Sequence, residues 1–404
     1  MDNRALSVFS SGSHCGVLTR SAVEEQTFLF CYDAGCADHH AVSLTMPVLP
    51  DQYDSVGTLH PVFEMNLPEG QLRHRLELMF SKVLPDFDTL SLLGLTGKSQ
   101  LGRLRYAAQG EGLEDVPAES VGMLLTYKGS EDLFDDLMAR YARYSGISGM
   151  QPKVLLRDLP GPLDRMSDRG ATHIVKSFNP REFPELAANE YFALKAAAYA
   201  GLPVAAARLS DNRSLLVVER FDRAGDGNYL GFEDFCVLSG LRSAGRYHGS
   251  YEDLARKVAV FVSPEHGRQA MEQLFGMIVH ACAIRNGDAH LKNFAILYDA
   301  PGRNVRLAPA YDLVSTTPYQ PKDVLALALN GEKRFPSRKV LMHFGRQACG
   351  LTNRQAAAII GRVVEGVRRV ETEMAAYAQA HPDFSDTAGR FAKTYEEGVK
   401  SLVD

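Results

Sequence analysis

The chain contains 404 residues, of which 45% are hydrophobic and 23% are charged. This composition is ordinary for a globular protein with a sizeable core, and the length suggests roughly two or three domains. The net charge of −5 excludes the general basic excess that usually marks nucleic-acid binding, although it does not exclude a local basic patch.

The cysteines and the apolar segments restrict the class further. The six cysteines include no C-x-x-C pair, and Cys31, Cys36, His39 and His40 form the one cluster that could suggest a metal. Structural zinc sites usually show tighter paired spacing, so we interpret these as loop and core residues of a reduced protein. The sequence shows no charged-then-apolar leader and no apolar run of about 18 residues. We therefore expect a cytoplasmic protein without membrane attachment.

The first part of the chain shows the patterns of strands and short helices. Strands are predicted at residues 7–9, 16–18, 27–30 and 42–46. The first two are separated by the turn residues Ser10-Ser11-Gly12, and the fourth stops at Pro47. A helical pattern then leads to Phe80.

Residues 97–99 read Gly-Lys-Ser, like the end of a phosphate-binding P-loop. The first glycine of that motif would fall on Leu92, and the phosphate cradle needs a glycine turn there. We therefore expect an ordinary solvated turn.

The middle of the chain begins with a linker and a glycine-containing loop. Residues 109–120 are rich in glycine, proline and acids, which makes them the best linker candidate. A helix is predicted from about Glu131 to Tyr144. Residues 145–153 then form a loop whose backbone amides could approach phosphates closely, although a plain hairpin turn fits it as well. Residues 154–156 predict a strand.

Lys176 lies within a predicted strand, residues 171–178. A lysine on a strand above the phosphates is the clamping arrangement of kinases, although most strand lysines face water. Residues 184–201 predict a helix that stops at Gly201. Its Glu185 or, preferably, Glu190 could pair with the lysine; a surface acid is the alternative interpretation.

A further strand, residues 213–218, leads into the segment 219–223. An extended segment that joins two lobes would offer backbone amide and carbonyl groups to an adenine edge. From about Asp234 onward the sequence predicts mostly helix.

Asp288 stands five residues before Asn293, and another acid, Asp312, follows two short apolar runs. In phosphoryl transfer, one carboxylate takes the proton of the attacking hydroxyl, while an amide and a second carboxylate hold Mg²⁺. The spacing Asp-x₄-Asn is that of the kinase catalytic loop. Because this spacing also arises by chance in many chains, its weight comes from the flanking apolar runs and from Asp312.

Two further features have a plain structural interpretation. His280 falls in the apolar run 271–284, which favours a core histidine over a ligand. The last predicted helix, residues 352–381, carries Arg354, Arg362, Arg368 and Arg369. These arginines could mimic a DNA-reading helix, but a solvated face is the usual explanation.

Together these segments resemble the HipA family of bacterial serine/threonine kinases, which are the toxins of toxin–antitoxin modules. The resemblance covers nearly the whole chain. Its motifs are residues 16–18, 43–47 and 63–69 in the N-terminal part, the glycine-rich loop 146–153, the lysine strand 172–176, the hinge 218–223, the catalytic loop 286–294 and the segment 307–312.

The resemblance implies an α+β, two-lobed protein-kinase-like fold with an additional N-terminal β-rich subdomain and a mostly helical C-terminal lobe. The expected parts are an N-terminal HipA-like subdomain in residues 1–107, a kinase N-lobe in residues 121–225 and a kinase C-lobe in residues 226–404.

The resemblance also implies ATP and Mg²⁺ as cofactors. Asp288 would accept the hydroxyl proton, and Asn293 and Asp312 would bind Mg²⁺. Lys176 would contact the phosphates. The remaining residues expected to contact ATP are Ser148, Gly149, Met150, Gln151, Lys153, Glu219, Arg220, Phe221, His290 and Lys292.

The glycine-rich loop of the family is autophosphorylated, and this chain departs from its usual pattern. Gly146-Ile147 occupies the position where family loops often have Ser-Ile. We expect Ser148 to be the phosphorylated residue instead, with Ser145 the less favoured alternative. A phosphate there would add about two negative charges and could expel the loop from the ATP site.

The expected partners also come from the resemblance alone. They are a small helix-turn-helix antitoxin of HipB type, operator DNA reached only through that complex, and a protein substrate such as an aminoacyl-tRNA synthetase. Two rival functions stay open: a small-molecule or lipid kinase on the same fold, and a catalytically silent regulatory binding subunit.

Overall fold

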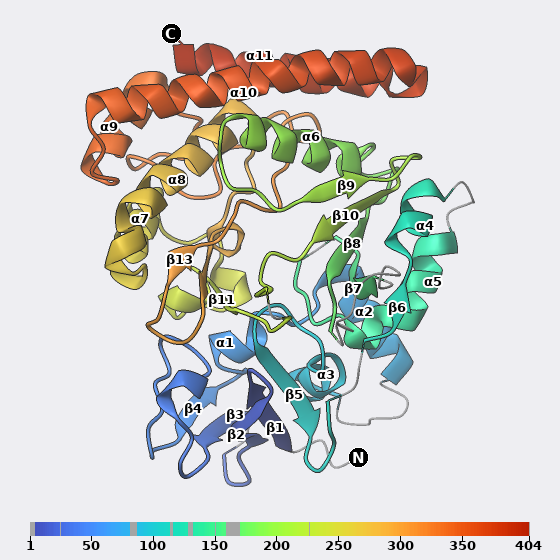
Figure 1. Cartoon of the computed structure of the whole chain (residues 1–404), viewed down its shortest axis with the longest axis vertical. Helices are drawn as coiled ribbons and strands as arrows, with labels where there is room; N and C mark the ends of the chain where they lie inside the picture. The colour runs from blue at the N-terminus through green and yellow to red at the C-terminus, as the bar shows by residue number, and fades with distance from the viewer. Residues whose placement is uncertain are drawn as a thin grey trace. The chain divides into compact units, whose positions relative to one another are not determined.

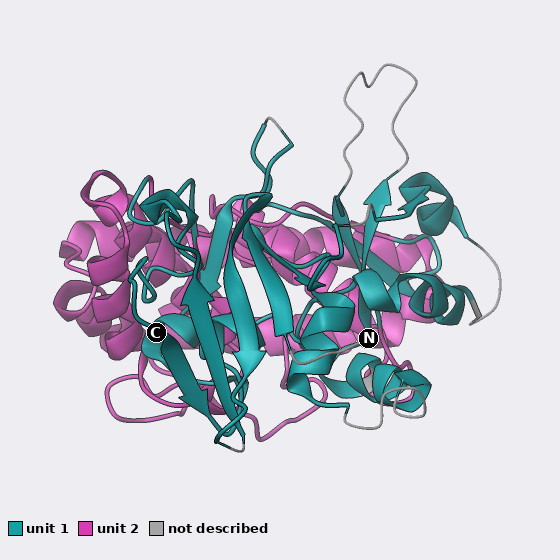
Figure 2. Cartoon of the chain, turned by 90° about the horizontal axis from the view of Figure 1, so that it is seen from below, with its two compact units in different colours: residues 1–177, 210–243, 297–303 teal, residues 178–209, 244–296, 304–404 magenta. Residues whose placement is uncertain are grey.

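The computed structural model describes residues 5–24, 26–80, 87–113, 116–127, 132–149, 151–158, 170–225 and 227–403. The chain divides into two compact units, shown in two colours in Figure 2. Unit 1 contains Met1–Ser177, Ser210–Ser243 and Leu297–Arg303, and unit 2 contains Phe178–Leu209, Ala244–Ile296 and Asn304–Asp404.

Unit 1 begins with a five-stranded antiparallel sheet in the order β4-β3-β2-β1-β5. Its strands are β1 (Ala5–Ser10), β2 (Ser13–Arg20), β3 (Thr27–Tyr32), β4 (Tyr53–Val56) and β5 (Leu104–Ala108). Ser11 and Gly12 both have positive φ, as a tight hairpin turn between β1 and β2 requires. The helices of this part are η1 (Asp38–His40), α1 (Pro61–Glu64), α2 (Gly70–Phe80) and α3 (Thr89–Thr96).

The predictions for this part are largely confirmed, with one error. The hairpin, the third strand and the helix ending at Phe80 are present. The strand predicted at residues 42–46 is wrong, because this segment forms only an isolated bridge between Ser43 and Met46. Its backbone groups bond to side chains instead: the Val42 N–H donates to the Tyr32 hydroxyl and the Leu44 N–H to the Glu233 carboxylate.

The apparent P-loop is a turn after a helix, as expected, but it is largely buried and not solvated, with Ser99 only 2% exposed. Residues 89–96 form α3, and Lys98 makes an ion pair with Glu111 at 3.0 Å. The Lys98 ammonium group is therefore paired with a carboxylate of the same unit and does not serve as a P-loop lysine in this structure.

A second sheet of unit 1 contains β6 (Ala118–Glu119), β7 (Lys153–Asp158), β8 (His173–Ser177) and β10 (Leu215–Glu219), in this order. The predicted linker is thus partly wrong, because its residues 118–119 pair in parallel with Arg157 and Asp158. Helix α4 (Val121–Thr126) lies nearby. The helix predicted from Glu131 to Tyr144 is confirmed by α5 (Asp132–Tyr141) and η2 (Ala142–Tyr144), and Glu131 itself lies outside the described residues. The unit also contains β11 (Gly231–Asp234) and η3 (Val237–Ser239).

Unit 2 is mostly helical, as predicted for the C-terminal part. Its elements are α6 (Leu186–Tyr199), β9 (Ala207–Leu209), α7 (Tyr251–Phe261), α8 (Pro264–Ala283), η5 (Leu291–Asn293), β13 (Arg306–Leu307), α9 (Arg338–Gln347), α10 (Asn353–Ala380), η6 (Pro382–Phe384) and α11 (Ser385–Val403). Strand β12 (Ala295–Tyr298) and the turn η4 (Ser243–Gly245) cross the boundary between the units along the chain.

Close helix packing defines the core of unit 2. The long helices α10 and α11 lie side by side (Figure 1). A Cβ on Gly366 of α10 would lie 2.6 Å from the Ala196 carbonyl oxygen of α6, so only glycine allows this approach. His280 is fully buried in α8, which confirms its assignment to the core. In the part of the chain that the structure describes, no helix is both long and apolar enough to cross a bilayer.

Candidate active site

The loop after α8 carries Asp288 and is held in an unusual conformation. Arg285 has a φ of 55°, and the Asn286 N–H closes the turn by donating to the Ala281 carbonyl at 2.8 Å. The Asn286 side chain then accepts the Asp288 N–H at 2.8 Å. Gly287 has no room for a side chain, because a Cβ would lie 2.4 Å from Cγ of Asp323. The backbone around Asp288 is therefore fixed from several sides.

A tyrosine hydroxyl contacts the Asp288 carboxylate. The Tyr247 hydroxyl donates to Asp288 Oδ1 at 2.7 Å. Burial raises the pKa of Asp288 to about 6; the Tyr247 hydrogen bond opposes this rise, and the charge of Asp312 adds to it. The side chain stays 49% exposed. A carboxylate that titrates near neutral pH and reaches solvent has the properties of a general base.

Asn293 and Asp312 lie together in unit 2, although they are 19 positions apart in the sequence. The Asn293 amide nitrogen lies 3.4 Å from Asp312 Oδ2. Asn293 Oδ1 accepts the His290 N–H at 3.1 Å, which leaves its second lone pair for another ligand. Asp312 has a φ of 56°, a conformation that aspartate tolerates better than most residues.

This pair fits a hard divalent cation. One amide oxygen and one carboxylate are ligands of the type that Mg²⁺ takes from proteins, with water and substrate phosphates completing its shell. Asn293 and Asp312 therefore have the donor chemistry that a divalent cation requires.

Helix α6 anchors the segment that follows Asp312. The Asn189 side chain accepts the Ser315 N–H at 2.7 Å and donates to the Ser315 carbonyl at 2.9 Å. The Thr316 hydroxyl donates to the Arg285 carbonyl at 3.2 Å and accepts the Gly287 N–H at 2.8 Å. The segment that contains Asp312 and the loop that contains Asp288 are therefore connected by hydrogen bonds. Glu190, the expected lysine partner, is buried on the same helix.

His290 and Lys292 lie in the same loop as Asp288. Burial and the charge of Arg246 lower the pKa of His290 to about 4, so its ring is neutral at pH 7. The Lys292 carbonyl accepts the Tyr311 hydroxyl at 2.7 Å, which joins the loop to the residue before Asp312.

Unit 1 places two lysines directly opposite each other. Lys153 of β7 pairs with Lys176 of β8 in the antiparallel register, so both side chains point to the same face of the sheet. Both residues are buried, with 4% and 5% exposure. Like charges directly opposite each other on paired strands are destabilising unless other groups compensate them.

The two serines of the glycine-rich loop differ in their surroundings. Ser145 is fully buried, and its hydroxyl donates to the Tyr141 carbonyl at 2.7 Å and accepts the Leu155 N–H at 2.9 Å. Ser148 is half-buried, and Gly149 beside it has a φ of 121°. Gln151 is half-buried as well, and Met150 lies outside the described residues.

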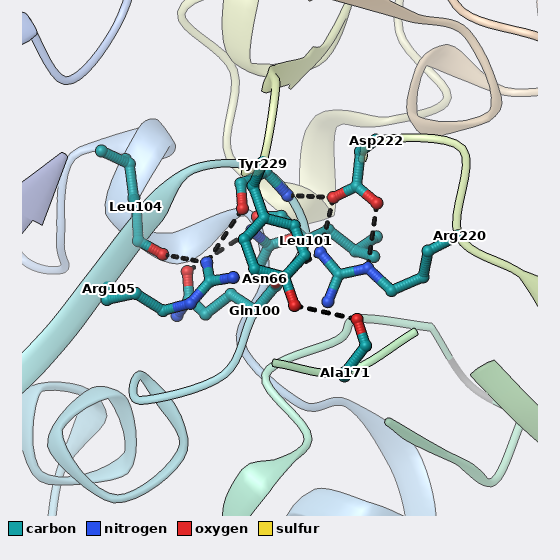
Figure 3. A network of polar contacts seen from close by, with 10 residues as sticks. Asn66, Gln100, Leu101, Leu104, Arg105, Ala171, Arg220, Asp222 and Tyr229 are labelled. Atoms are coloured by element: carbon teal, nitrogen blue, oxygen red, sulfur yellow. Dashed lines mark hydrogen bonds and ion pairs between the residues drawn. The ribbon is translucent and has the colours of Figure 1, made fainter. Parts of the chain in front are cut away.

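The expected hinge residues Glu219, Arg220 and Phe221 lie at the end of β10, and a buried polar network holds the Arg220 side chain (Figure 3). The Arg220 guanidinium donates to Asp222 at 2.6 and 2.9 Å and to the Gln100 carbonyl at 2.8 Å. The Arg220 backbone N–H already donates to the Thr172 carbonyl at 3.0 Å. Glu219 is exposed and Phe221 is half-buried.

The network extends to the first sheet of unit 1. The Gly102 N–H donates to Asp222 Oδ2 at 2.6 Å. The Tyr229 ring lies 4.3 Å from the guanidinium carbon of Arg105 and 4.4 Å from that of Arg220, and its hydroxyl donates to the Ala171 carbonyl. Residues near β5 therefore support the hinge directly (Figure 3).

The expected site residues thus form two groups, one in each unit. Unit 2 brings together Asp288, His290, Lys292, Asn293 and Asp312 in two connected segments, and unit 1 brings Lys153 together with Lys176. Sequence reasoning missed Tyr247 and Asn189, which contact these segments. No sequence signal marks either residue, because Tyr247 lies 41 positions from Asp288 and Asn189 lies 126 positions from Ser315.

Comparisons with known proteins agree on the family. Residues 145–370 match the HipA-like C-terminal domain, and residues 6–107 match the HipA N-terminal domain. Two similar proteins of Sinorhizobium fredii are provisionally named kinases: Y4mE is 35% identical over 43% of this chain and 43% of its own, and Y4dM is 30% identical over 50% and 49%. The chain therefore matches half or less of the length of these relatives.

A solved structure from Shewanella oneidensis MR-1 shares the fold. It is the complex of the toxin–antitoxin system proteins HipA and HipB with operator DNA, and the alignment covers 98% of this chain and 96% of that one, with a TM-score of 0.67 and 19% identity. The two domain models together cover most of the sequence, in the order in which the fold presents them. The chain belongs to the HipA family and has its kinase-like α+β fold.

Proposed function

We propose that this protein is an ATP-dependent serine/threonine protein kinase of HipA type. The observation that carries the proposal is the approach of the Asn293 amide to the Asp312 carboxylate at 3.4 Å, on segments joined by hydrogen bonds to the loop that contains Asp288. Phosphoryl transfer needs groups that bind Mg²⁺ and a base that accepts the hydroxyl proton, and this amide–carboxylate pair and Asp288 are groups of these two kinds.

In the proposed reaction, the oxygen of a serine or threonine hydroxyl bonds to the γ-phosphorus of ATP. The bond from that phosphorus to the β,γ-bridging oxygen breaks, ADP leaves, and the hydroxyl proton passes to the Asp288 carboxylate. Bound Mg²⁺ would neutralise negative charge on the phosphates. Lys153 and Lys176 would contact the phosphates, and the backbone of Glu219 and Phe221 would contact the adenine.

We further propose autophosphorylation on Ser148. The hydroxyl of Ser145 makes two hydrogen bonds inside unit 1, and its phosphorylation would require that part of the fold to open. The neighbouring Gly149 gives the loop at Ser148 a backbone that other residues rarely adopt.

The proposed partners follow from the family. A helix-turn-helix antitoxin would bind the protein in the cytoplasm and connect it to operator DNA, as HipB accompanies HipA and operator DNA in the Shewanella structure. The proposed substrate is a protein such as an aminoacyl-tRNA synthetase, whose modification would arrest growth.

The experiment is incubation of the protein with labelled ATP, Mg²⁺ and cell lysate, followed by mapping of the phosphorylated sites. The wild type should label serine or threonine of a protein, and Asp288→Asn should lower the rate by about 10²-fold or more. Asp386→Asn removes an exposed carboxylate of α11 and should behave as the wild type. Label only on small molecules or lipids would contradict a protein kinase, and equal labelling by Asp288→Asn would contradict the assigned base.

A further inference from the structure

The Tyr247 side chain contacts both Asp288 and His290 of the catalytic loop. It follows η4 (Ser243–Gly245), and the Leu291 N–H donates to the carbonyl of the preceding Arg246 at 3.1 Å. Its ring packs edge-on against the His290 ring, with centroids 5.0 Å apart and an interplanar angle of 81°. The backbone just before Tyr247 and the Tyr247 ring thus both contact the loop, and the hydroxyl lies 2.7 Å from Asp288 Oδ1, although the residue is 42% exposed.

The two oxygens of the Asp288 carboxylate differ in their hydrogen bonding. Oδ1 accepts the Tyr247 hydroxyl, and in the described part of the chain no other side chain donates a hydrogen bond to the carboxylate. His290 Nε2 lies 3.9 Å from the same oxygen, which is too far for a hydrogen bond. Oδ2 is therefore left for an incoming hydroxyl. A base that is itself oriented by a third group is a recurring arrangement in enzymes.

We propose that Tyr247 is a positioning residue that orients Asp288 for proton abstraction and favours its ionised form. This inference rests on the proposed kinase function for its kinetic consequence, but its structural part concerns only Tyr247 and Asp288. A hydroxyl hydrogen bond to a carboxylate is charge-assisted and stabilises the anion. The other charged groups that act on Asp288 are Asp312, Arg246 and Asp323, with the neutral His290 beside them.

Tyr247 could also have the opposite role and block the substrate, and the variant Tyr247→Phe distinguishes the two roles. A tyrosine that occupied the position of the acceptor hydroxyl would block the substrate, and its removal would raise the rate. A tyrosine that orients the base would lower the rate when its hydroxyl is removed. Tyr247→Phe separates the two, because phenylalanine keeps the ring against His290 and removes only the hydroxyl, with its hydrogen bonds to Asp288 and Arg246.

The test compares Tyr247→Phe with Tyr251→Phe. Tyr251 is the matched control, because its hydroxyl also donates to this loop, at the Ala289 carbonyl 2.9 Å away, but not to a carboxylate. Loss of a charge-assisted hydrogen bond in Tyr247→Phe should lower kcat about tenfold, leave the KM for ATP unchanged and move the acidic limb of the kcat profile to higher pH. In Tyr251→Phe that limb should stay in place.

A second measurement does not depend on kinase activity. The Asp288 carboxyl can be titrated by NMR in protein labelled with carbon-13 aspartate, with the signal assigned by its absence in Asp288→Asn. Its pKa should rise in Tyr247→Phe and stay unchanged in Tyr251→Phe. An unchanged Asp288 titration, or a raised kcat, in Tyr247→Phe would overturn the inference. If Tyr247→Phe raises the Asp288 pKa as expected but the wild type shows no kinase activity, the result would support the contact between Tyr247 and Asp288 and contradict the proposed kinase function.

Discussion

The pKa of Asp288 sets a pH dependence that can be measured. Burial raises this pKa to about 6, and a general base works only when ionised. The kcat/KM of the wild type should therefore fall about tenfold per pH unit below pH 6 and level off above it. A profile without an acidic limb between pH 5 and 7 would show that a different group accepts the proton.

The same carboxyl carries a stability cost above its pKa. A raised folded-state pKa means that stability is present at low pH and is lost as the pH rises through about 6. Asp288→Asn should therefore raise the melting temperature slightly at pH 8 and leave it unchanged near pH 4. Because the side chain is half exposed, solvent screening keeps the gain below about 1 kcal/mol.

Ser148 and Ser145 give opposite expectations for phosphorylation. After incubation with MgATP, mass spectrometry should find phosphate on Ser148, and Ser148→Ala should remove it. Ser145→Ala should retain the phosphate but lose stability, because its hydroxyl donor and acceptor positions are both used in a buried site. Phosphate on Ser145 of a folded protein would contradict this order.

At the scale of elements, the buried pair Arg220–Asp222 connects β10 with the segment before β5. Burial alone would raise the pKa of Asp222, but the Arg220 guanidinium and the Gly102 N–H outweigh burial and hold that pKa below its usual value. The two side chains are 0% and 3% exposed. Removing one partner would leave a buried charge without compensation.

Asp222→Asn should therefore lower the free energy of unfolding by about 3–5 kcal/mol, measured by chemical denaturation. Glu77→Gln is the control: it breaks the exposed pair of Arg73 and Glu77 in α2, and such pairs contribute at most about 1 kcal/mol. Equal effects of the two variants would show that the network around Tyr229 does not hold the hinge.

The elements around the site were predictable where the pattern was long or strongly periodic. The lysine strand β8 and the helix α6 lie where the sequence predicted them, and most of their buried residues are apolar. The strand expected at residues 42–46 failed because Glu233 and Tyr32 satisfy its backbone, and Glu233 is 190 positions from Ser43. Local pattern contains no information about such distant partners.

In the candidate site, too, residues within a local motif were predictable and residues that act through distant contacts were not. The spacing Asp-x₄-Asn pointed to Asp288 and Asn293 only together with the flanking apolar runs and Asp312. Asp312 required the flanking apolar runs. Tyr247 and Asn189 could not be found, because each acts through one hydrogen bond to a segment far away in the sequence. The pairing of Lys153 with Lys176 likewise needed the register of β7 and β8.

At the scale of the whole molecule, both HipA domain matches and the Shewanella complex describe the same architecture. Each unit brings its own group of residues: unit 1 the lysine pair and the hinge, and unit 2 the carboxylates and Asn293.

Calorimetric titration of ATP with and without Mg²⁺ tests the central claim most directly. Mg²⁺ should tighten ATP binding to the wild type by about tenfold or more, which corresponds to about 1.4 kcal/mol. Asp312→Asn should bind ATP alone like the wild type and lose the gain from Mg²⁺, because the carboxylate that lies 3.4 Å from the Asn293 amide is gone. An undiminished gain from Mg²⁺ in Asp312→Asn would contradict the account.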